Sequence, residues 1–308
     1  MSADRFQRIG EFCEQSGSAA LLIIREGKCV YAWGNVQTRY PTHSMRKALL
    51  NGLYGIYVDR GVIDTLATLA DLNIDDISPK LSETEKQAEV RDLLASRSGV
   101  YHQAAAESES MVESRPERGS HPHGTYFYYN NWDFNVLGTI FERVTGKTVF
   151  DAFDEEFAVP LGMRHYSPKD GRYLLEEDKS VHPAYHIWMN AYDLALYGLL
   201  FQANGVWNGR QIISQDWIKA STTYRSEYIK DVGLGYGWLW YVFSEDAGLG
   251  RAFMTTGDGI HMLAVFKDLD LVVVHRVDSE RKASEITFTG DNLYQLFGMV
   301  VDAVTNGQ

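Results

Sequence analysis

The chain has 308 residues, of which 45% are hydrophobic and 13% aromatic, and its formal net charge is −12. This length can bury a large core, so we expect one folded body of two lobes. No basic stripe is present, which argues against a nucleic-acid partner. The start lacks an apolar leader, and no stretch approaches the roughly 18 apolar residues of a membrane helix. We therefore expect a cytoplasmic protein with no membrane partner; its oligomeric state stays open.

In chain order, residues 3–16 are expected to form a short amphipathic helix, and residues 19–34 a β-hairpin that turns at Glu26 and Gly27. Residues 44–204 are mostly helical in pattern, with loops rich in Gly, Ser, Pro and His. Residues 235–277 return to β-branched and aromatic runs, and residues 285–304 include a closing amphipathic helix.

Strands at both ends of a helical middle predict an α+β fold, in which terminal helices flank an antiparallel sheet. We expect a sheet lobe from residues 1–45 and 205–308. Residues 46–204 would form a mostly helical second lobe, with a site between the two.

The first chemical signal is "HSMRK", residues 43–47, at the start of an apolar helical pattern. A lysine three residues after a serine lies one helical turn away, so Lys47 could remove the proton of Ser44. The helix start would also direct backbone N–H groups at a developing negative charge. Ser44 is equally a good helix cap, and the same spacing recurs at Ser279 and Lys282.

Further segments decide between these interpretations. Residues 93–102 ("LLASRSGVYH"), 128–146 and 188–214 follow the serine motif in order. Together they resemble the serine β-lactamase and penicillin-recognising superfamily, and within it the class C-like esterases and 6-aminohexanoate-oligomer hydrolases. The resemblance implies a β-lactamase-like fold, with Ser44 as nucleophile and Lys47 as its base, and requires no metal or organic cofactor.

In the segment "YYNNW" the family's Tyr-x-Asn motif fits two phases, and the Leu-Gly that follows favours Tyr129 and Asn131. Tyr129 would protonate the leaving group, because a phenol beside a lysine ammonium can have its pKa lowered. Asn131 would hold Lys47 and a substrate amide.

The third family element is a strand that carries a cation and a backbone oxyanion donor. The segment "TTGDG", residues 255–259, fits it best, with Thr256, Gly257 and Asp258 at the substrate. The segment also fits a simple hairpin turn, and the two interpretations are compatible. We expect the N–H of Ser44 as the first oxyanion donor, and that of Asp258 or a neighbour as the second.

Thr255 stands where the family has its cation, and Asp258 adds a negative charge. Like charges a few Å apart repel by about 1 kcal/mol or more in a partly screened site. The sequence therefore predicts a small neutral or cationic ester or amide substrate, and poor recognition of β-lactams. His261, expected at the substrate, or Arg276 could instead supply the missing cation.

Other functions stay open at this point. The same residues suit a transacylase with an amine or alcohol acceptor, or an acyl-binding sensor or scaffold without turnover. A metal site is a weaker alternative for the loop histidines, which more simply line the cleft: His102, His121, His123, His182 and His186.

Overall fold

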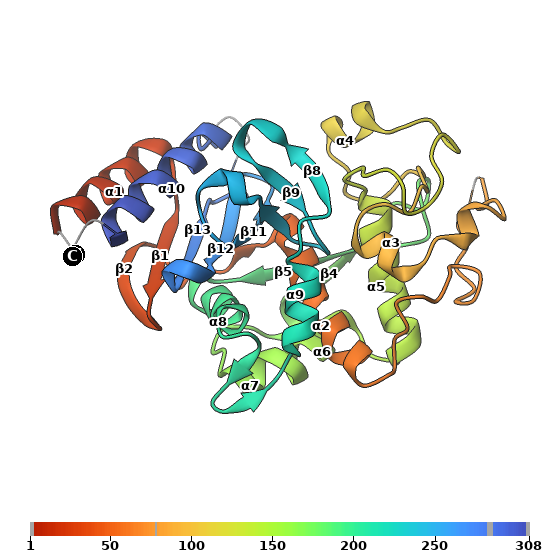
Figure 1. Ribbon diagram of the computed structural model, residues 1–308, viewed down its shortest axis with the longest axis horizontal. Coiled ribbons are helices and arrows are strands. Elements are labelled where there is room, and N and C mark those ends of the chain that lie inside the picture. The colour runs from red at the N-terminus through yellow and green to blue at the C-terminus, as the bar shows by residue number, and fades with distance from the viewer. Residues whose placement is uncertain (1–2, 78, 282–285, 306–308) are drawn as a thin grey trace.

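The computed structural model describes residues 3–77, 79–281 and 286–305. Its largest element is an antiparallel sheet of eight strands in the order β2-β1-β13-β12-β11-β10-β9-β8 (Figure 1), which confirms the predicted α+β fold. The strands are β1 (Ala20–Arg25), β2 (Lys28–Gly34), β8 (Ser226–Ile229), β9 (Leu234–Tyr236), β10 (Tyr241–Phe243), β11 (Ala252–Gly257), β12 (His261–Phe266) and β13 (Leu271–Arg276).

Both faces of this sheet are covered, which explains the unbroken apolar runs of its central strands. Helices α1 (Ala3–Ser16) and α10 (Gly290–Thr305) lie side by side against one face, where Phe297 meets Phe266 with ring centroids 5.5 Å apart. Helix α8 (Ala191–Gln202) packs against the other face, against β1, β12 and β13. Leu263, three residues from Phe266, faces α8 at Gly198, as the alternation of a strand requires.

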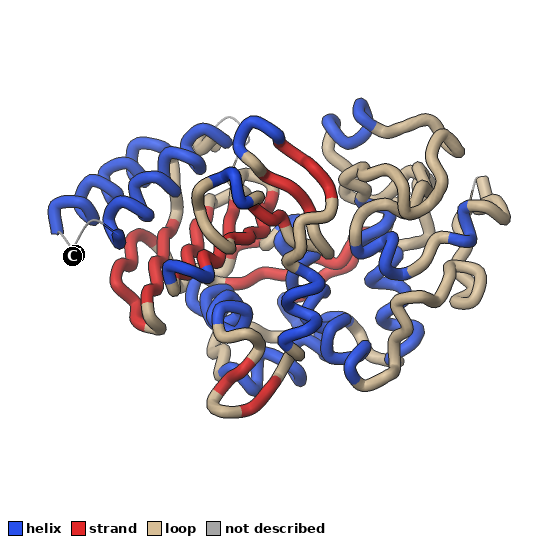
Figure 2. Tube along the Cα trace, in the orientation of Figure 1, coloured by secondary structure: helices blue, strands red, loops and turns tan. Residues whose placement is uncertain are grey.

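The middle of the chain forms the second region, in which helices and long loops predominate (Figure 2). Helix α2 runs through it with nearly all of its side chains buried. Helix α5 begins at a side-chain cap from Asn130 and ends at Gly146, whose φ of +69° suits glycine. The helices are α2 (Arg46–Asp59), α3 (Val90–Leu94), α4 (Glu109–Ser114), α5 (Asn131–Thr145), α6 (Val149–Phe153), α7 (Val159–Leu161) and α9 (Gln215–Ser221).

Two features of this region differ from the expected pattern. A small sheet joins β3 (Tyr40–Pro41), β5 (Ala184–Met189) and β4 (Gly171–Leu174), and its strands β4 and β5 lie where the sequence indicated mostly helix. The boundary between residues 204 and 205 stays a prediction, but the packing of α8 on the main sheet favours an earlier one.

The remaining elements are short. A two-stranded hairpin joins β6 (Val206–Trp207) to β7 (Arg210–Gln211). Single turns of 3-10 helix are η1 (His43–Met45), η2 (Glu85–Gln87), η4 (Pro168–Asp170), η5 (Lys230–Val232), η6 (Glu245–Ala247) and η7 (Lys267–Leu269); η3 (Asp154–Ala158) is a π turn. Among the described residues, no helix combines the length and apolar character needed to cross a membrane.

Candidate active site

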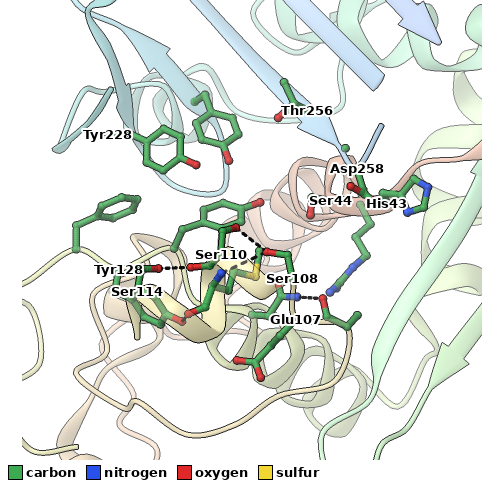
Figure 3. Close-up of a pocket in the computed structure, with 18 of the residues that line it drawn as sticks. His43, Ser44, Glu107, Ser108, Ser110, Ser114, Tyr128, Tyr228, Thr256 and Asp258 are labelled. Atoms are coloured by element: carbon green, nitrogen blue, oxygen red, sulfur yellow. Dashed lines mark hydrogen bonds between the residues drawn. The ribbon is translucent and has the colours of Figure 1, made fainter. Parts of the chain in front are cut away.

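A cavity of about 840 Å³ opens where the start of α2 meets the end of β11 and the loop before α5. Figure 3 shows Ser44 at this cavity, between Thr256 and Asp258 on one side and Ser108 and Ser110 on the other. The structure thus brings together residues that are more than 200 positions apart in the sequence.

Ser44 lies in the 3-10 turn η1, just before α2 begins at Arg46. The capping position of α2 is Met45, and no side chain caps this helix. Ser44 is therefore not the cap that its position in the sequence allowed. The preceding residue, His43, has a φ of +48°, a strained conformation for a residue with a Cβ. A 2.8 Å hydrogen bond between its Nε2 and Ser279 Oγ helps to hold it there.

Lys47 links the other two candidate catalytic groups. Its Nζ donates hydrogen bonds to Ser44 Oγ and to Tyr129 OH, each at 2.8 Å. The first contact follows from the one-turn spacing along the chain, whereas the second depends on how α2 and the loop before α5 pack together. Nζ also lies 4.3 Å from the ring centroid of Tyr129 and 4.5 Å from that of Phe134.

Burial shifts the pKa values of Lys47 and Tyr129 in opposite directions. Lys47 is 1% exposed, and desolvation, assisted by the neighbouring Arg46 charge, holds its pKa well below the usual range. Desolvation also raises the pKa of Tyr129 to about 12, although hydrogen bonds with Ser44 and Tyr241 oppose the rise. The expectation of a lowered tyrosine pKa was therefore wrong, because desolvation of the phenol outweighs the hydrogen bonds that lower its pKa.

Of the two possible phases of the tyrosine motif, the structure brings Tyr129 to Lys47. Tyr128 points elsewhere, and its OH donates to the carbonyl of Met111. Asn130 donates to the carbonyl of Val100 and caps α5, so its side chain is fully used within the fold.

Asn131 lines the cavity but does not hold Lys47 as the sequence suggested. Its Nδ2 donates instead to the carbonyl of Ala106. A carbonyl can only accept a hydrogen bond, so this partner fixes the orientation of the amide. The Oδ1 atom then remains buried without a partner. Asn131 can therefore offer a substrate an acceptor, not a donor.

The third motif approaches Ser44 through the end of β11. Thr256, Gly257 and Asp258 line the cavity, whereas Thr255 is buried opposite Leu263 of β12. A Cβ on Gly257 would lie 2.4 Å from the carbonyl oxygen of Thr42, so only glycine lets the strand reach the turn that carries Ser44. The role of the Asp258 N–H as an oxyanion donor stays a prediction.

His261 and Arg276 do not replace the missing cation. His261 is fully buried, with its Nε2 at 3.0 Å from Ser279 Oγ, and it is absent from the cavity wall. Arg276 is also fully buried; it donates to His261 Nδ1 at 3.0 Å and to the carbonyls of Tyr40 and Met189. His261 was predicted at the substrate, and Arg276 was only left open as an alternative cation; both side chains instead anchor the segment that precedes Ser44.

Sequence reasoning missed two groups at the site. Tyr241 of β10 lines the cavity and donates a hydrogen bond to Tyr129. Arg46, inside the serine motif, lies in the cavity wall with a guanidinium nitrogen that has no partner. No local signal could reveal Tyr241, but a charged residue next to Lys47 on a buried helix could have been noticed.

The histidines named as alternative metal ligands are dispersed. Among residues 3–77, 79–281 and 286–305, no group of three or more His, Cys, Asp or Glu side chains could hold a metal ion. His182 is fully buried and hydrogen-bonded to Thr139 and to the carbonyl of Asp75. His186 alone among them lines the cavity beside Ser44.

A serine, a lysine and a tyrosine in contact beside an antiparallel sheet define the class of β-lactamase-like serine hydrolases. The family model described as Beta-lactamase matches residues 7–284, and the chain belongs to this family. None of the curated proteins matches the chain.

Solved structures share this fold. A protein from Bacillus anthracis assigned as a 6-aminohexanoate-dimer hydrolase superposes with a TM-score of 0.71 at 17% identity, over 96% of this chain and 81% of its own. The octameric penicillin-binding protein homologue from Pyrococcus abyssi gives 0.69 at 18% identity, over 97% and 78%. A class C beta-lactamase from Rhodobacter sphaeroides gives 0.66 at 15% identity, over 97% and 100%. At these identities the likeness concerns the fold.

Proposed function

We propose that the protein is a serine hydrolase that cleaves an ester or amide through an acyl-enzyme on Ser44. The observation that carries this proposal is the pair of 2.8 Å hydrogen bonds that join Lys47 to Ser44 and Tyr129. A serine hydroxyl is a weak nucleophile until a base takes its proton, and a buried neutral amine is such a base.

In the first half of the reaction, the Ser44 proton moves to Lys47 Nζ while Oγ forms a bond to the substrate carbonyl carbon. The bond to the leaving group then breaks, and Tyr129 gives its proton to the departing alcohol or amine. Lys47 returns its extra proton to Tyr129 across their 2.8 Å contact, which restores both groups.

In the second half, water replaces the leaving group and the same transfers run in reverse. The water loses its proton to Tyr129, which passes a proton to Lys47, and Lys47 protonates Ser44 as the acyl group leaves. The N–H groups of Ser44 and Asp258 would stabilise the oxyanion in both halves.

The β11 side of the cavity favours a substrate that is neutral or cationic where it faces the strand. Thr255 supplies no cation, and the exposed Asp258 repels a carboxylate there. We therefore expect β-lactams to be poor substrates, and a penicillin turned over faster than simple esters would contradict this specificity.

The test is intact-protein mass after treatment with a fluorophosphonate, together with turnover of 4-nitrophenyl butyrate, for the wild type and Ser44→Ala. One adduct on Ser44, with repeated turnover lost in the variant, supports the proposal. Labelling without turnover would favour an acyl-binding protein or a transacylase, which added amines or alcohols would distinguish by their acylated products. Absence of labelling at Ser44 would refute the proposal.

A further inference from the structure

Arg46 is a buried cation in the wall of the cavity that contains Ser44. It is 2% exposed, and its Nη2 donates to the neutral side chain of Asn135 at 2.8 Å. Its Cζ lies 4.3 Å from the ring centroid of Tyr185, while Nη1 is buried without a hydrogen-bond partner. The guanidinium is thus held in place by neutral groups, with one donor unused.

No acidic side chain in the described part of the chain forms an ion pair with Arg46. Glu107, an acid in the cavity wall, is already paired with Arg115. Arginine stays charged at every accessible pH, and a buried charge is costly unless it is paired. Buried polar atoms without partners are rare in folded proteins, so an unpartnered donor on a residue that lines the cavity is a candidate partner for a substrate group.

Other groups in the cavity define what this substrate group can be. Among the described residues that line the cavity, Arg46 is the only arginine or lysine, and burial with the nearby positive charges lowers the pKa of His186 to about 3, so His186 does not compete with Arg46 as a cation. Two exposed acids, Asp258 and Glu227, line other parts of the cavity and repel an anion there. Positive charge is therefore concentrated at the buried floor, around Arg46.

We infer that the substrate of Ser44 carries a carboxylate that pairs with Arg46 at the floor of the cavity. This inference rests on the proposed function and adds a charge requirement to it. The substrate would be neutral beside β11 and anionic beside α2, because the cation is carried by the helix of the nucleophile and not by the strand. Carboxylate and guanidinium fit each other as planar, charge-assisted partners.

The experiment compares three 4-nitrophenyl esters of similar length that differ in terminal charge: the adipate monoester, the hexanoate and the 6-aminohexanoate. After subtraction of spontaneous hydrolysis, kcat/KM of the wild type should be highest for the adipate monoester and lowest for the 6-aminohexanoate. Equal rates, or a preference for the neutral or cationic ester, would overturn the inference.

Substitution of Arg46 shows whether this residue causes the preference. The ratio of kcat/KM for adipate monoester to hexanoate should fall at least about tenfold in Arg46→Gln, the usual size of a lost charged hydrogen bond. Arg46→Lys keeps the buried charge but loses the planar guanidinium, so it should give an intermediate ratio. This variant keeps the test valid if Arg46→Gln fails to fold. Arg60→Gln, at the far end of α2, changes net charge equally and should leave the ratio unchanged. An unchanged ratio in Arg46→Gln would refute the role of Arg46.

A binding measurement separates this inference from the proposed function. In Ser44→Ala, which cannot form an acyl-enzyme, monomethyl adipate should raise the melting temperature more than methyl hexanoate does. The difference should disappear when Arg46→Gln is added. Binding of this kind without any turnover by the wild type would refute the hydrolase but keep the carboxylate site; turnover without charge preference would do the opposite.

Discussion

The two walls of the cavity that contains Ser44 differ in how much of the family pattern they keep. The helical wall, from α2 and the loop before α5, holds Ser44, Lys47 and Tyr129 in mutual contact. The end of β11 keeps Gly257, but the family's cation position is occupied by Thr255, which is buried outside the cavity wall, and Asp258 adds a negative charge to the wall. Under the proposed function, the groups that cleave the bond lie together on the helical wall, whereas recognition of the substrate is divided between Arg46 on that wall and Asp258 at the end of β11.

Burial explains why the walls can diverge. On the helical wall, Ser44 and Tyr129 are the hydrogen-bond partners of the buried Lys47 Nζ, so losing either partner leaves this amine less well satisfied, which is costly. Asp258, in contrast, is exposed at a turn and bonds to no group that the reaction needs. The strand end can therefore change its charge without disturbing Ser44, provided that Gly257 stays.

The largest effect is expected from substitution of Lys47, the proposed general base on the helical wall. Lys47→Met should lower kcat/KM for 4-nitrophenyl butyrate by roughly a thousandfold, the scale of a lost general base. The melting temperature should stay similar, since an apolar side chain of similar length replaces a buried amine, and its partners Ser44 and Tyr129 are only half-buried and line the cavity. Retained activity in a folded variant would mean that another group deprotonates Ser44.

Gly257→Ala tests whether the β11 wall positions the nucleophile. The added Cβ would come 2.4 Å from Thr42 O and 3.1 Å from His43 Cβ, so the turn carrying Ser44 must shift. A shift of about 1 Å at reacting atoms can cost a hundredfold in rate, and we expect a loss of that order in kcat/KM. Gly298→Ala on α10, where a Cβ meets nothing within 4 Å, is the matched control and should keep normal kinetics.

The pH profile should sharpen the assignment of base and acid. Activity needs neutral Lys47 and protonated Tyr129. It should therefore rise as the pH passes the lowered pKa of Lys47, well below the ordinary lysine value of 10.5, and fall only near 12, where Tyr129 ionises. Measured kcat/KM against pH checks this. If kcat/KM rises only near pH 10.5, burial does not lower the pKa of Lys47.

Tyr241→Phe should have a smaller effect on the same profile. Tyr241 donates to the Tyr129 oxygen and lowers the pKa of that phenol, so its loss should raise this pKa and move the alkaline limb upward. We expect kcat/KM to fall by a factor of about three to ten, the size of one neutral hydrogen bond. A simple packing defect would lower activity without moving the limb.

The smallest effect is expected from substitution of Asp258 at the end of β11. Asp258→Asn removes a negative charge that opposes a substrate carboxylate near β11, a repulsion of about 1 kcal/mol. The ratio of kcat/KM for benzylpenicillin to that for 4-nitrophenyl butyrate should therefore rise about fivefold, from a low starting value. An unchanged ratio would mean that Asp258 does not limit β-lactam recognition.

The short-range pattern of the sequence was sufficient to predict part of the fold and one contact of the candidate site. The hairpin of β1 and β2 and the helices α1 and α10 follow from short-range periodicity, and the fold class follows from their order. The contact between Ser44 and Lys47 follows from a one-turn spacing, because the 3-10 turn that contains Ser44 leads directly into α2, which carries Lys47.

Tertiary structure decided what periodicity cannot encode. Tyr241 reaches Tyr129 from a strand more than 100 residues away, and no property of its own segment indicates this. The direction of each pKa shift depends on desolvation by the whole fold, so the sequence suggested a lowered value for Tyr129 where burial raises it to about 12. His261 likewise has the chemistry of a substrate ligand, but packing turns it toward Ser279 and Arg276. The sequence by itself determined which reactive groups the protein has; burial and long-range packing determined which of them meet, and in which protonation state.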